Sequence, residues 1–296
     1  MLNFNSQNFK FSIIIPAYNE ANAIKSVLQE LKSYLSEKKY QTEIIVVDDG
    51  STDQTNKILR DFKDIKFISH PYNKGYGASL KTGVKNSEYD WLLWYDSDGQ
   101  HQPFYIEELI KYCDEYDMII GARVGYQGPF FRQPGKKLLH YLAEYLVQQK
   151  IPDLNSGFRL VKKDLFLKFA HILPNGFSAS TTITLAFFKE GLNVKYIPIA
   201  IKKRKGKSSV KMQDGMKAVM LILRTIILFS PLRIFLPVSI LILGLALFSL
   251  GFDIFPYSQG QLNLGDATIL LFISSLFFFF FGLLADQISA IRRERL

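Results

Sequence analysis

Short apolar runs alternate with amphipathic stretches along the first two thirds of the chain, and this alternation predicts an α/β domain. Near-continuous apolar runs are typical of strands in a parallel sheet that helices cover on both faces. In residues 21–35, apolar residues recur at intervals of three and four, which predicts an amphipathic helix. Further helices are expected from Thr52 onward and at residues 77–85 and 103–113, between strands at residues 11–15, 43–47, 65–69, 91–95 and 117–121.

Two uncharged segments of 19 residues each, residues 234–252 and 267–285, lie near the C-terminus. At about 1.5 Å per residue, each would form a helix of roughly 28 Å, close to the thickness of the hydrocarbon core of a bilayer. The alternative, two buried helices of a soluble core, would need more chain around them than the sequence offers. The predicted parts are an α/β domain at residues 1–210, a basic juxtamembrane amphipathic segment at residues 211–233, and a transmembrane hairpin with a short tail at residues 234–296.

The net charge of +9 comes from one segment of the chain. Residues 195–233 contain ten Lys or Arg and one acid, Asp214, so the rest of the chain sums to zero. Such a block indicates an anionic partner, and because an uncharged span follows it directly, we expect membrane lipid and no nucleic acid. The single cysteine, Cys113, excludes an intramolecular disulfide and fits a reducing compartment.

Basic residues flank the two predicted spans on one side only. Arg233 precedes the first span, and Arg292, Arg293 and Arg295 follow the second, whereas the connecting residues 253–266 contain no Lys or Arg. By the positive-inside rule, we expect a multi-pass protein of the cell (inner) membrane, with its N-terminal domain and both termini in the cytoplasm. The N-terminal residues lack the basic and then apolar pattern of a signal peptide, so no cleavage is expected.

Polar residues follow four of the predicted strands, at the edge where ligands bind to such sheets. These are PAYNE at residues 16–20, DDGSTD at residues 48–53, DSDGQ at residues 96–100 and GAR at residues 121–123. Solvation explains any one polar turn, but four at one edge argue for a site. The chain has neither GxGxxG after its first strand nor GxxxxGKS or GxxxxGKT, so a nucleotide would have to be held in another way.

Asp96 and Asp98 follow an apolar run directly, and two carboxylates so close in sequence repel each other unless a cation lies between them. Carboxylate oxygens are hard ligands suited to Mg²⁺ or Mn²⁺, and the carbonyl of Gln100 could add a third ligand. A metal ion held there would bridge the two phosphates of a nucleotide. The alternative is a turn that is simply solvated, and the position at a strand end favours the metal site.

Six segments together resemble those of family 2 glycosyltransferases, and more narrowly those of the dolichyl- or polyprenyl-phosphate glycosyltransferases. In order they are IIIPAYNE, IIVVDDGSTD, NKGYGASLKTG, YDSDGQH, GAR and LNSGFRL. The resemblance covers about residues 10–210, and two trailing spans also occur in many bacterial members. It implies a GT-A fold, a Rossmann-like domain that binds a nucleotide-diphospho-sugar, followed here by two transmembrane helices.

The resemblance also implies roles for individual residues of the donor site. Asp96, Asp98 and Gln100 match the family's metal-binding D-x-D-x-Q motif, with Mg²⁺ or Mn²⁺ as the cofactor. Arg204 in RKGKSS matches the arginine of a loop that closes over the donor. A lysine usually follows where this chain has Ser209, so Lys207 or Lys211 would replace it. The residues expected to bind the nucleotide-sugar are Pro16, Tyr18, Glu20, Val47, Asp49, Asp96, Ser97, Asp98, Arg204 and Lys207.

Another set of residues is expected at the acceptor. Arg123 matches an arginine that faces the phosphates and the acceptor, and Asp153 matches an acid that orients the acceptor or the sugar; a purely structural Asp153 is the alternative. With Asp98, these two form the expected catalytic set. An acceptor phosphate is expected to contact Arg123, Arg132, Lys136, Ser156 and Arg159.

The expected activity is an inverting transfer of one sugar from a UDP- or GDP-sugar to polyprenyl phosphate, either undecaprenyl or dolichyl, at the cytoplasmic membrane face. A lipid phosphate is already an anion at neutral pH, so it needs cations more than a general base. The motif QxxRW and the ED-type base of processive members are absent. The alternatives are a family 2 transferase with a saccharide hydroxyl as acceptor and a non-catalytic membrane scaffold. A homo-oligomer is possible in this group.

Overall fold

The computed structural model describes residues 9–38, 40–124, 140–141, 143–145, 147–176, 178–202, 230–254 and 264–294. The chain forms two compact units, residues 1–215 and residues 216–296, and each is described by itself. The basic segment predicted at residues 211–233 lies outside the described residues apart from its last four.

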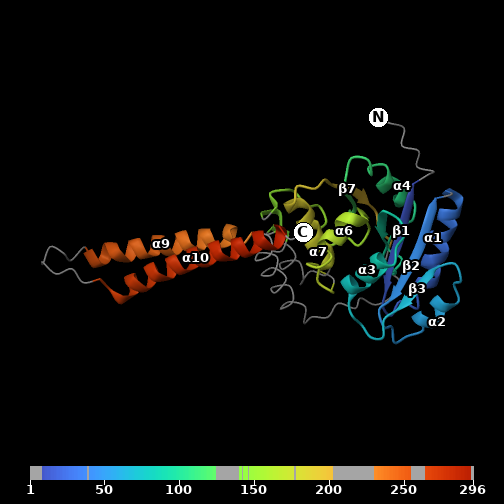
Figure 1. The fold of residues 1–296 in the computed structure, drawn as a ribbon, viewed down its shortest axis with the longest axis horizontal. Coiled ribbons are helices and arrows are strands. Elements are labelled where there is room, and N and C mark those ends of the chain that lie inside the picture. Colours follow the sequence, from blue (N-terminus) through green and yellow to red (C-terminus); the bar gives the residue numbers. More distant parts are fainter. Residues whose placement is uncertain are drawn as a thin grey trace. The chain divides into compact units, whose positions relative to one another are not determined.

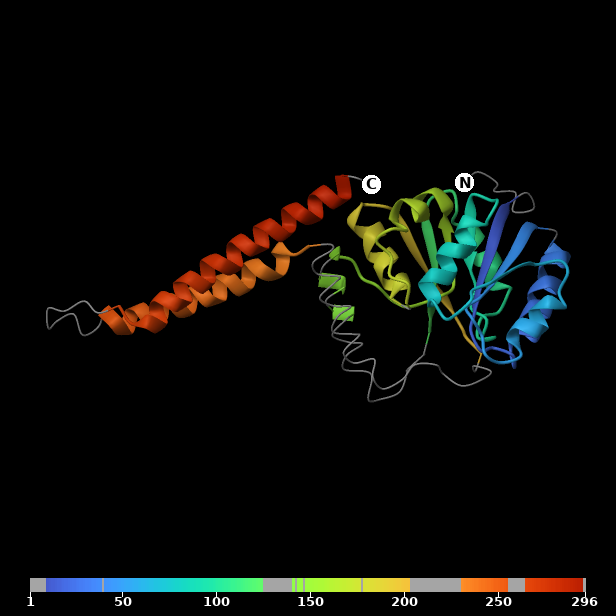
Figure 2. The same cartoon turned by 60° about the horizontal axis from the view of Figure 1, so that its bottom comes forward.

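A seven-stranded sheet in the order β3-β2-β1-β4-β6-β5-β7 forms the centre of the first unit (Figures 1 and 2). The first five strands overlap the five predicted strands, and their ends differ by one or two residues, which is ordinary fraying. The strands are β1 (Lys10–Ala17), β2 (Gln41–Asp48), β3 (Lys66–Ser69), β4 (Trp91–Trp94), β5 (Met118–Arg123), β6 (Arg159–Lys162) and β7 (Val194–Ile199).

The five predicted strands run parallel to one another, but the sheet also contains β6, an antiparallel strand that the sequence pattern does not predict. It pairs antiparallel with β4 on one side and with β5 on the other, so that Arg159 lies opposite both Trp94 and Ile120. The other pairs are parallel. Because β6 runs against its neighbours, the residues just before it reach the edge at which β4 and β5 end. This edge therefore receives the loop before β6 in addition to the loops that follow the parallel strands.

Helices cover both faces of the sheet, as the sequence predicts. Side chains alternate along β1: Ile13 and Ile15 belong to the main apolar cluster with residues of α1 and α4, whereas Ile14 faces Gly83 of α3. On the side of α3, α7 packs against both α3 and α6. The helices are α1 (Ile24–Lys38), α2 (Thr55–Arg60), α3 (Tyr76–Lys85), α4 (Tyr105–Ile110), α6 (Lys163–Phe169) and α7 (Ala179–Lys189).

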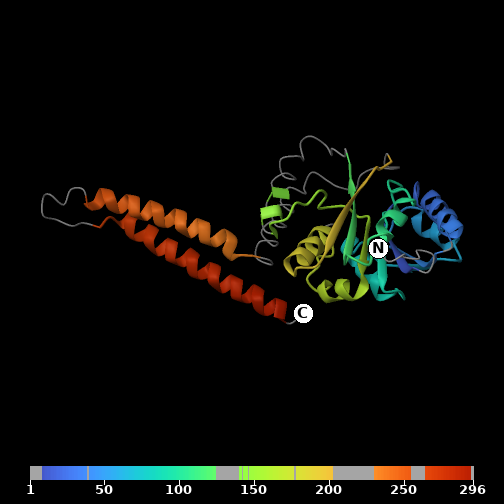
Figure 3. The ribbon, with the colours of Figure 1, turned by 90° about the horizontal axis from the view of Figure 1, so that it is seen from above.

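The second unit is a hairpin of two long apolar helices, α9 (Leu232–Ile254) and α10 (Asp266–Glu294), which lie side by side (Figure 3). Both have a mean hydropathy of 2.4 over their most apolar window and are long enough to cross a membrane. Ser239 Oγ donates to the carbonyl of Ser275 at 3.0 Å, and Asp253 accepts a hydrogen bond from Thr268 at 2.6 Å. Few of the described side chains of the two helices are buried, which does not fit the alternative of buried helices in a soluble core.

Gly83 allows α3 to approach β1, and Gly83→Ala should destabilise the first unit. An added Cβ would overlap the side chain of Ile14, which is fully buried and branched. Overpacking costs about 1–3 kcal/mol, and the better helix propensity of Ala returns up to about 1 kcal/mol. We expect the thermal midpoint of the full chain in detergent to fall by about 3–6 °C.

Gly176→Ala is the matched control, because nothing lies within 4 Å of its Cβ position. An equal effect of the two substitutions would contradict the packing explanation.

Candidate active site

Asn19 joins the loop after β1 to the loop after β2. Its φ of 55° lies in the left-handed region, which Asn tolerates better than most residues. Its Oδ1 accepts the backbone N–H of Thr52 at 2.8 Å, and its own N–H donates to Ser51 Oγ at 2.9 Å. The N–H of Glu20 donates to Thr55 Oγ1 at 2.9 Å. PAYNE and DDGSTD therefore form one wall of the site.

The residues predicted to bind the nucleotide differ in what they present to it. Pro16 and Val47 are buried within β1 and β2, so only their backbone atoms are available at the edge. Glu20 and Ser97 are buried in turns, and Tyr18 is half-buried beside Asn19.

Asp49 uses its carboxylate inside the protein. Its Oδ1 accepts the backbone N–H of Lys74 at 2.9 Å and lies 2.7 Å from His70 Nδ1, and its Oδ2 accepts the N–H of Gly75 at 2.7 Å. The other nitrogen of His70 lies 2.9 Å from Thr82 Oγ1. Asp49 and His70 are both buried. Asp49 thus fixes the turn from which α3 begins, close to the predicted nucleotide site.

Asp96 lies at the end of β4 and contacts residues from elsewhere in the chain. Its Oδ1 accepts from Tyr76 Oη at 3.3 Å, and its Oδ2 lies 3.1 Å from Nε2 of the buried His101. Burial by itself raises the pKa of Asp96, but the hydrogen bond from His101 and the charge of Arg123 outweigh it, so the pKa is lowered. A carboxylate that stays ionised can bind a cation.

Asp98 is buried, and its Oδ1 accepts the backbone N–H of Gln100 at 3.1 Å within the same turn. The N–H of Lys202 donates to the carbonyl of Gln100 at 2.9 Å, so the chain after β7 lies against this loop. Within the described residues, no group of three or more His, Cys, Asp or Glu could hold a metal ion. The available set is two carboxylates and one amide carbonyl. It fits Mg²⁺ or Mn²⁺, which usually completes its coordination with phosphate oxygens and water.

Arg123 and Asp153 form a two-pronged ion pair at the same edge. Arg123 Nε donates to Asp153 Oδ2 at 2.7 Å, and Nη2 donates to Oδ1 at 2.9 Å. Burial raises the pKa of Asp153, but the hydrogen bonds and charge of Arg123 prevail, and the pKa is lowered. The structure brings this predicted pair together, and each side chain holds the other.

Ser156 and Arg159 lie beneath the site and not on its surface. Both are fully buried. Ser156 Oγ donates to the carbonyl of Gly121 at 2.6 Å, and Arg159 Nη1 donates to the carbonyl of Ser180 at 3.2 Å and to Thr184 Oγ1 at 3.0 Å. These positions argue against the predicted direct contact with an acceptor phosphate, because neither side chain reaches solvent.

Four other predicted site residues lie outside the described residues: Arg132, Lys136, Arg204 and Lys207. The same holds for Lys211, the alternative to Lys207.

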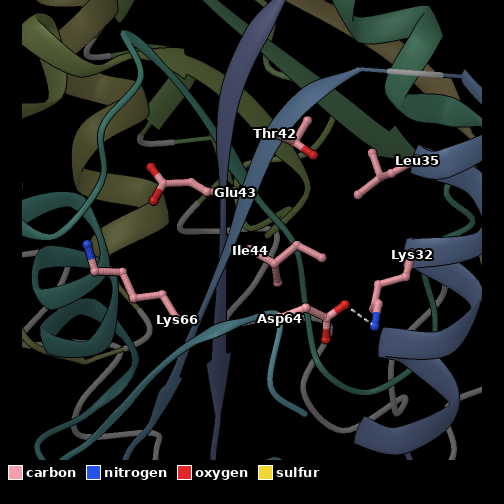
Figure 4. Close-up of a pocket in the computed structure, with 7 residues that line it drawn as sticks. All are labelled: Lys32, Leu35, Thr42, Glu43, Ile44, Asp64 and Lys66. Carbon is pink, nitrogen blue, oxygen red and sulfur yellow. Dashed lines mark ion pairs between the residues drawn. The ribbon is translucent and has the colours of Figure 1, made fainter.

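A cavity of about 300 Å³ lies away from this edge, near the start of β2 and β3 (Figure 4). Its charged side chains are paired: Lys32 with Asp64, Glu43 with Ser12 and the N–H of Glu88, and Lys66 with the carbonyl of Asn86. The cavity contains none of the predicted site residues.

The sequence pattern of glycosyl transferase family 2 matches residues 12–169, and that of the GtrB C-terminal hairpin matches residues 230–291. The chain belongs to glycosyltransferase family 2. The match includes Asp96, Asp98, Arg123 and Asp153, and the second pattern coincides with α9 and α10. This confirms the family that the six segments resemble.

Two relatives and one solved structure show how far the likeness extends. The glycosyltransferase is 29% identical over 198 residues to the uncharacterized protein MJ1222 of Methanocaldococcus jannaschii. The matched region covers 63% of this chain and 79% of the relative. The chain is 28% identical over 214 residues to the UDP-N-acetylglucosamine–dolichyl-phosphate N-acetylglucosaminyltransferase of Methanococcus voltae, covering 63% and 83%. Glucosyl-3-phosphoglycerate synthase from Mycobacterium tuberculosis shares its fold, with a TM-score of 0.59 and 18% identity over 73% of this chain and 78% of the other. The GT-A type of fold is confirmed.

Several residues that shape the site of this glycosyltransferase were not predicted. Asn19, Tyr76 and Gly157 reach it through contacts with residues distant in sequence, and only the motifs PAYNE, NKGYG and SGFR marked their segments. His101, directly after DSDGQ, lies 3.1 Å from Asp96 Oδ2 and so contacts one of the predicted metal ligands.

The pair of Arg123 and Asp153 predicts a pH-dependent loss of stability. The pKa of Asp153 is lower in the folded than in the unfolded state, so its contribution is present above the unfolded value of about 3.9 and is lost as the pH falls through the folded value. Asp153→Asn should therefore destabilise the protein at pH 7 by about 2–3 kcal/mol, and this difference should shrink below pH 4.

Thermal unfolding at pH 7 and at pH 3.5 measures this, with Asp61→Asn as the control at an exposed acid. A difference between wild type and Asp153→Asn that is the same at both pH values would contradict the ion pair.

Proposed function

We propose that this glycosyltransferase moves one sugar from a UDP- or GDP-sugar to polyprenyl phosphate, at the cytoplasmic face of the cell membrane and with Mg²⁺ or Mn²⁺. Similarity supports each part separately. The relative from Methanococcus voltae is named for a UDP-sugar donor and a dolichyl phosphate acceptor. The structural neighbour was crystallised with Mn²⁺ and UDP. The hairpin of α9 and α10 would hold the enzyme where a lipid acceptor lies.

The pairing of Asp153 with Arg123 is the observation that favours a phosphate acceptor over a hydroxyl acceptor. A hydroxyl acceptor needs a general base whose pKa lies near the working pH. Asp153 is paired with Arg123 through two hydrogen bonds and its pKa is lowered, which makes it a poor proton acceptor. A phosphate acceptor is ionised at pH 7 and loses no proton in the reaction. The helix α7, on which a base could stand, begins with Ala179 and the hydroxyl residues Ser180 to Thr182.

The residues then have distinct tasks. Asp96, Asp98 and Gln100 would hold the metal ion, which supplies positive charge to the leaving diphosphate. Arg123, fixed by Asp153, would keep one orientation toward the phosphates. Additional cations for the donor and acceptor would come from outside the described residues: Arg132, Lys136, Arg204, and Lys207 or Lys211.

The orientation in the membrane follows from charge. Arg233 lies at the start of α9, Arg292 and Arg293 lie in the last turn of α10 and Arg295 follows it, whereas residues 253–266 contain no Lys or Arg. We infer that the hairpin enters and leaves from the cytoplasmic side, which places the donor site in the compartment of the nucleotide-sugars.

A transfer assay with the full-length enzyme tests the proposed acceptor. Radiolabelled UDP-glucose, UDP-N-acetylhexosamines and GDP-mannose are each supplied with polyprenyl phosphate and Mn²⁺. We expect label from one donor in the lipid phase. No label should appear there after addition of EDTA, because EDTA removes the Mn²⁺ that would offset the negative charge of the two reactants.

Label only in aqueous product would favour the hydroxyl acceptor. No transfer from any donor, together with no metal-dependent binding of UDP or GDP, would favour the scaffold.

Asp98→Ala should reduce the rate of transfer by at least about a hundredfold. The substitution removes a metal ligand beside a leaving group that gains charge in the transition state. The thermal midpoint without ligand should change by no more than about 3 °C, since relief of repulsion with Asp96 offsets the hydrogen bond lost from Gln100. Asp114→Ala, at an exposed acid, is the control. Near-normal activity of Asp98→Ala would show that Asp98 is not a metal ligand, and failure to fold would contradict the prediction that its loss affects turnover more than folding.

A further inference from the structure

The two aspartates of the motif are held in different ways. Asp98 bonds to the backbone of Gln100 within its own turn. Asp96 is contacted by one residue further along its own loop, His101, and by two from other places in the fold, Tyr76 at the start of α3 and Gly157 just before β6. We propose that these three residues form a clamp that sets the Asp96 carboxylate for the metal ion before donor binds. This inference rests on the proposed metal site.

His101 is the rigid part of the clamp. Its ring is buried and stacks on Phe158, with centroids 5.0 Å apart and planes at 22°. Its carbonyl accepts the hydroxyl of Tyr95 at 2.8 Å, which fixes its backbone. Because an ionised carboxylate only accepts hydrogen bonds, the proton at the 3.1 Å contact lies on Nε2 of His101. Nδ1 is buried and has no hydrogen-bond partner in the described part of the chain, so the ring makes its hydrogen bond there through Nε2.

Tyr76 holds the opposite oxygen of Asp96. Its hydroxyl donates to Oδ1 at 3.3 Å, while His101 bonds to Oδ2. Tyr76 is the first residue of α3, and Asp49 fixes the preceding turn through the N–H groups of Lys74 and Gly75. The buried Asp49 thereby acts on Asp96 through Tyr76. Each oxygen of Asp96 has one such hydrogen bond and keeps lone-pair capacity for a cation.

Gly157 supplies the space into which the carboxylate fits. A Cβ added at Gly157 would collide with both carboxylate oxygens of Asp96 and with no backbone atom among its nearest contacts. An alanine there would push the end of the Asp96 side chain away but leave the strand β6 in place. Gly157→Ala thus displaces a metal ligand without removing one.

The clamp predicts a loss of metal affinity in variants that keep every proposed metal ligand. Partners that orient a metal ligand typically contribute a factor of about 10–100 in affinity. His101→Phe keeps the stacked ring and loses the donor, so we expect UDP-dependent Mn²⁺ binding to weaken by about that factor. His101→Gln places an amide N–H where Nε2 was, so we expect its affinity for Mn²⁺ in the presence of UDP to stay within about threefold of wild type. Gly157→Ala should weaken Mn²⁺ binding by about the same factor as His101→Phe.

Mn²⁺ binding to the full-length protein in detergent, with and without UDP, is followed by the electron paramagnetic resonance signal of free Mn²⁺. His171→Phe, at an exposed histidine, and Gly176→Ala, with open space at its Cβ, are matched controls. If wild type binds Mn²⁺ and UDP together while His101→Phe and Gly157→Ala bind as wild type does, the clamp is wrong and the metal site stands. If His101→Gln binds Mn²⁺ as wild type does while His101→Phe does not, the result supports a hydrogen bond from His101 to Asp96 over a merely structural role of the ring.

If wild type shows no UDP-dependent binding of Mn²⁺, the proposed metal site itself fails. The clamp is then judged in the metal-free protein labelled with ¹⁵N-histidine. The contact is supported if the ¹⁵N resonance of His101 shows a proton on Nε2 and this resonance shifts in Asp96→Ala. A resonance that shows no proton on Nε2 overturns the contact.

Discussion

The pairing of Trp94 with Arg159, where β4 meets the antiparallel β6, is the constraint on which the site depends. Because the two strands run in opposite directions, the loop that enters β6 meets the loop that leaves β4. Asp96 follows Trp94 by two positions and Gly157 precedes Arg159 by two, so this register places the carboxylate against the glycine. A parallel strand would enter from the far edge of the sheet and would carry Asp153 and Gly157 away from Arg123 and Asp96.

The same register buries a cation beneath the acids. Arg159 is fully buried, stacks on the ring of Trp94 at 5.0 Å, and bonds to backbone carbonyls. Burial lowers its pKa, and the charges of Asp153 and Asp96 oppose that effect. Arginine keeps its proton in proteins, so Arg159 and Arg123 bring two positive charges close to the carboxylates of Asp96 and Asp153. On the proposed function, this positive charge would weaken the binding of a divalent ion by the protein alone, which suits a metal ion that binds together with a diphosphate.

The sequence predicts the parts of this fold that depend on local pattern. Five strands, their polar ends and the two apolar spans follow from residue periodicity, because burial on both faces selects continuous apolar runs. The direction of β6 has no local signal, since its four residues pair equally well in either sense. The burial of Arg159 was missed for a related reason: an arginine is usually exposed, and only the tertiary fold brings the carbonyls of Ser156 and Ser180 to its guanidinium. The pairing of Arg123 with Asp153 likewise spans 30 residues.

Basic residues are concentrated in the sequence between β7 and the first apolar helix. The backbone N–H of Lys202, just beyond β7, donates to the carbonyl of Gln100 in the loop after β4, and the next helix described, α9, begins at Leu232. Residues 203–229 join the two and contain seven Lys or Arg and one acid. On the proposed function, both reactants are anions, and Arg123 is already paired with Asp153. Positive charge for the acceptor phosphate then has to come from segments such as this one. Under that proposal, the lysines and arginines of residues 203–229 are candidates to meet the phosphate of a polyprenyl acceptor, because basic residues next to a membrane span in the sequence attract anionic headgroups.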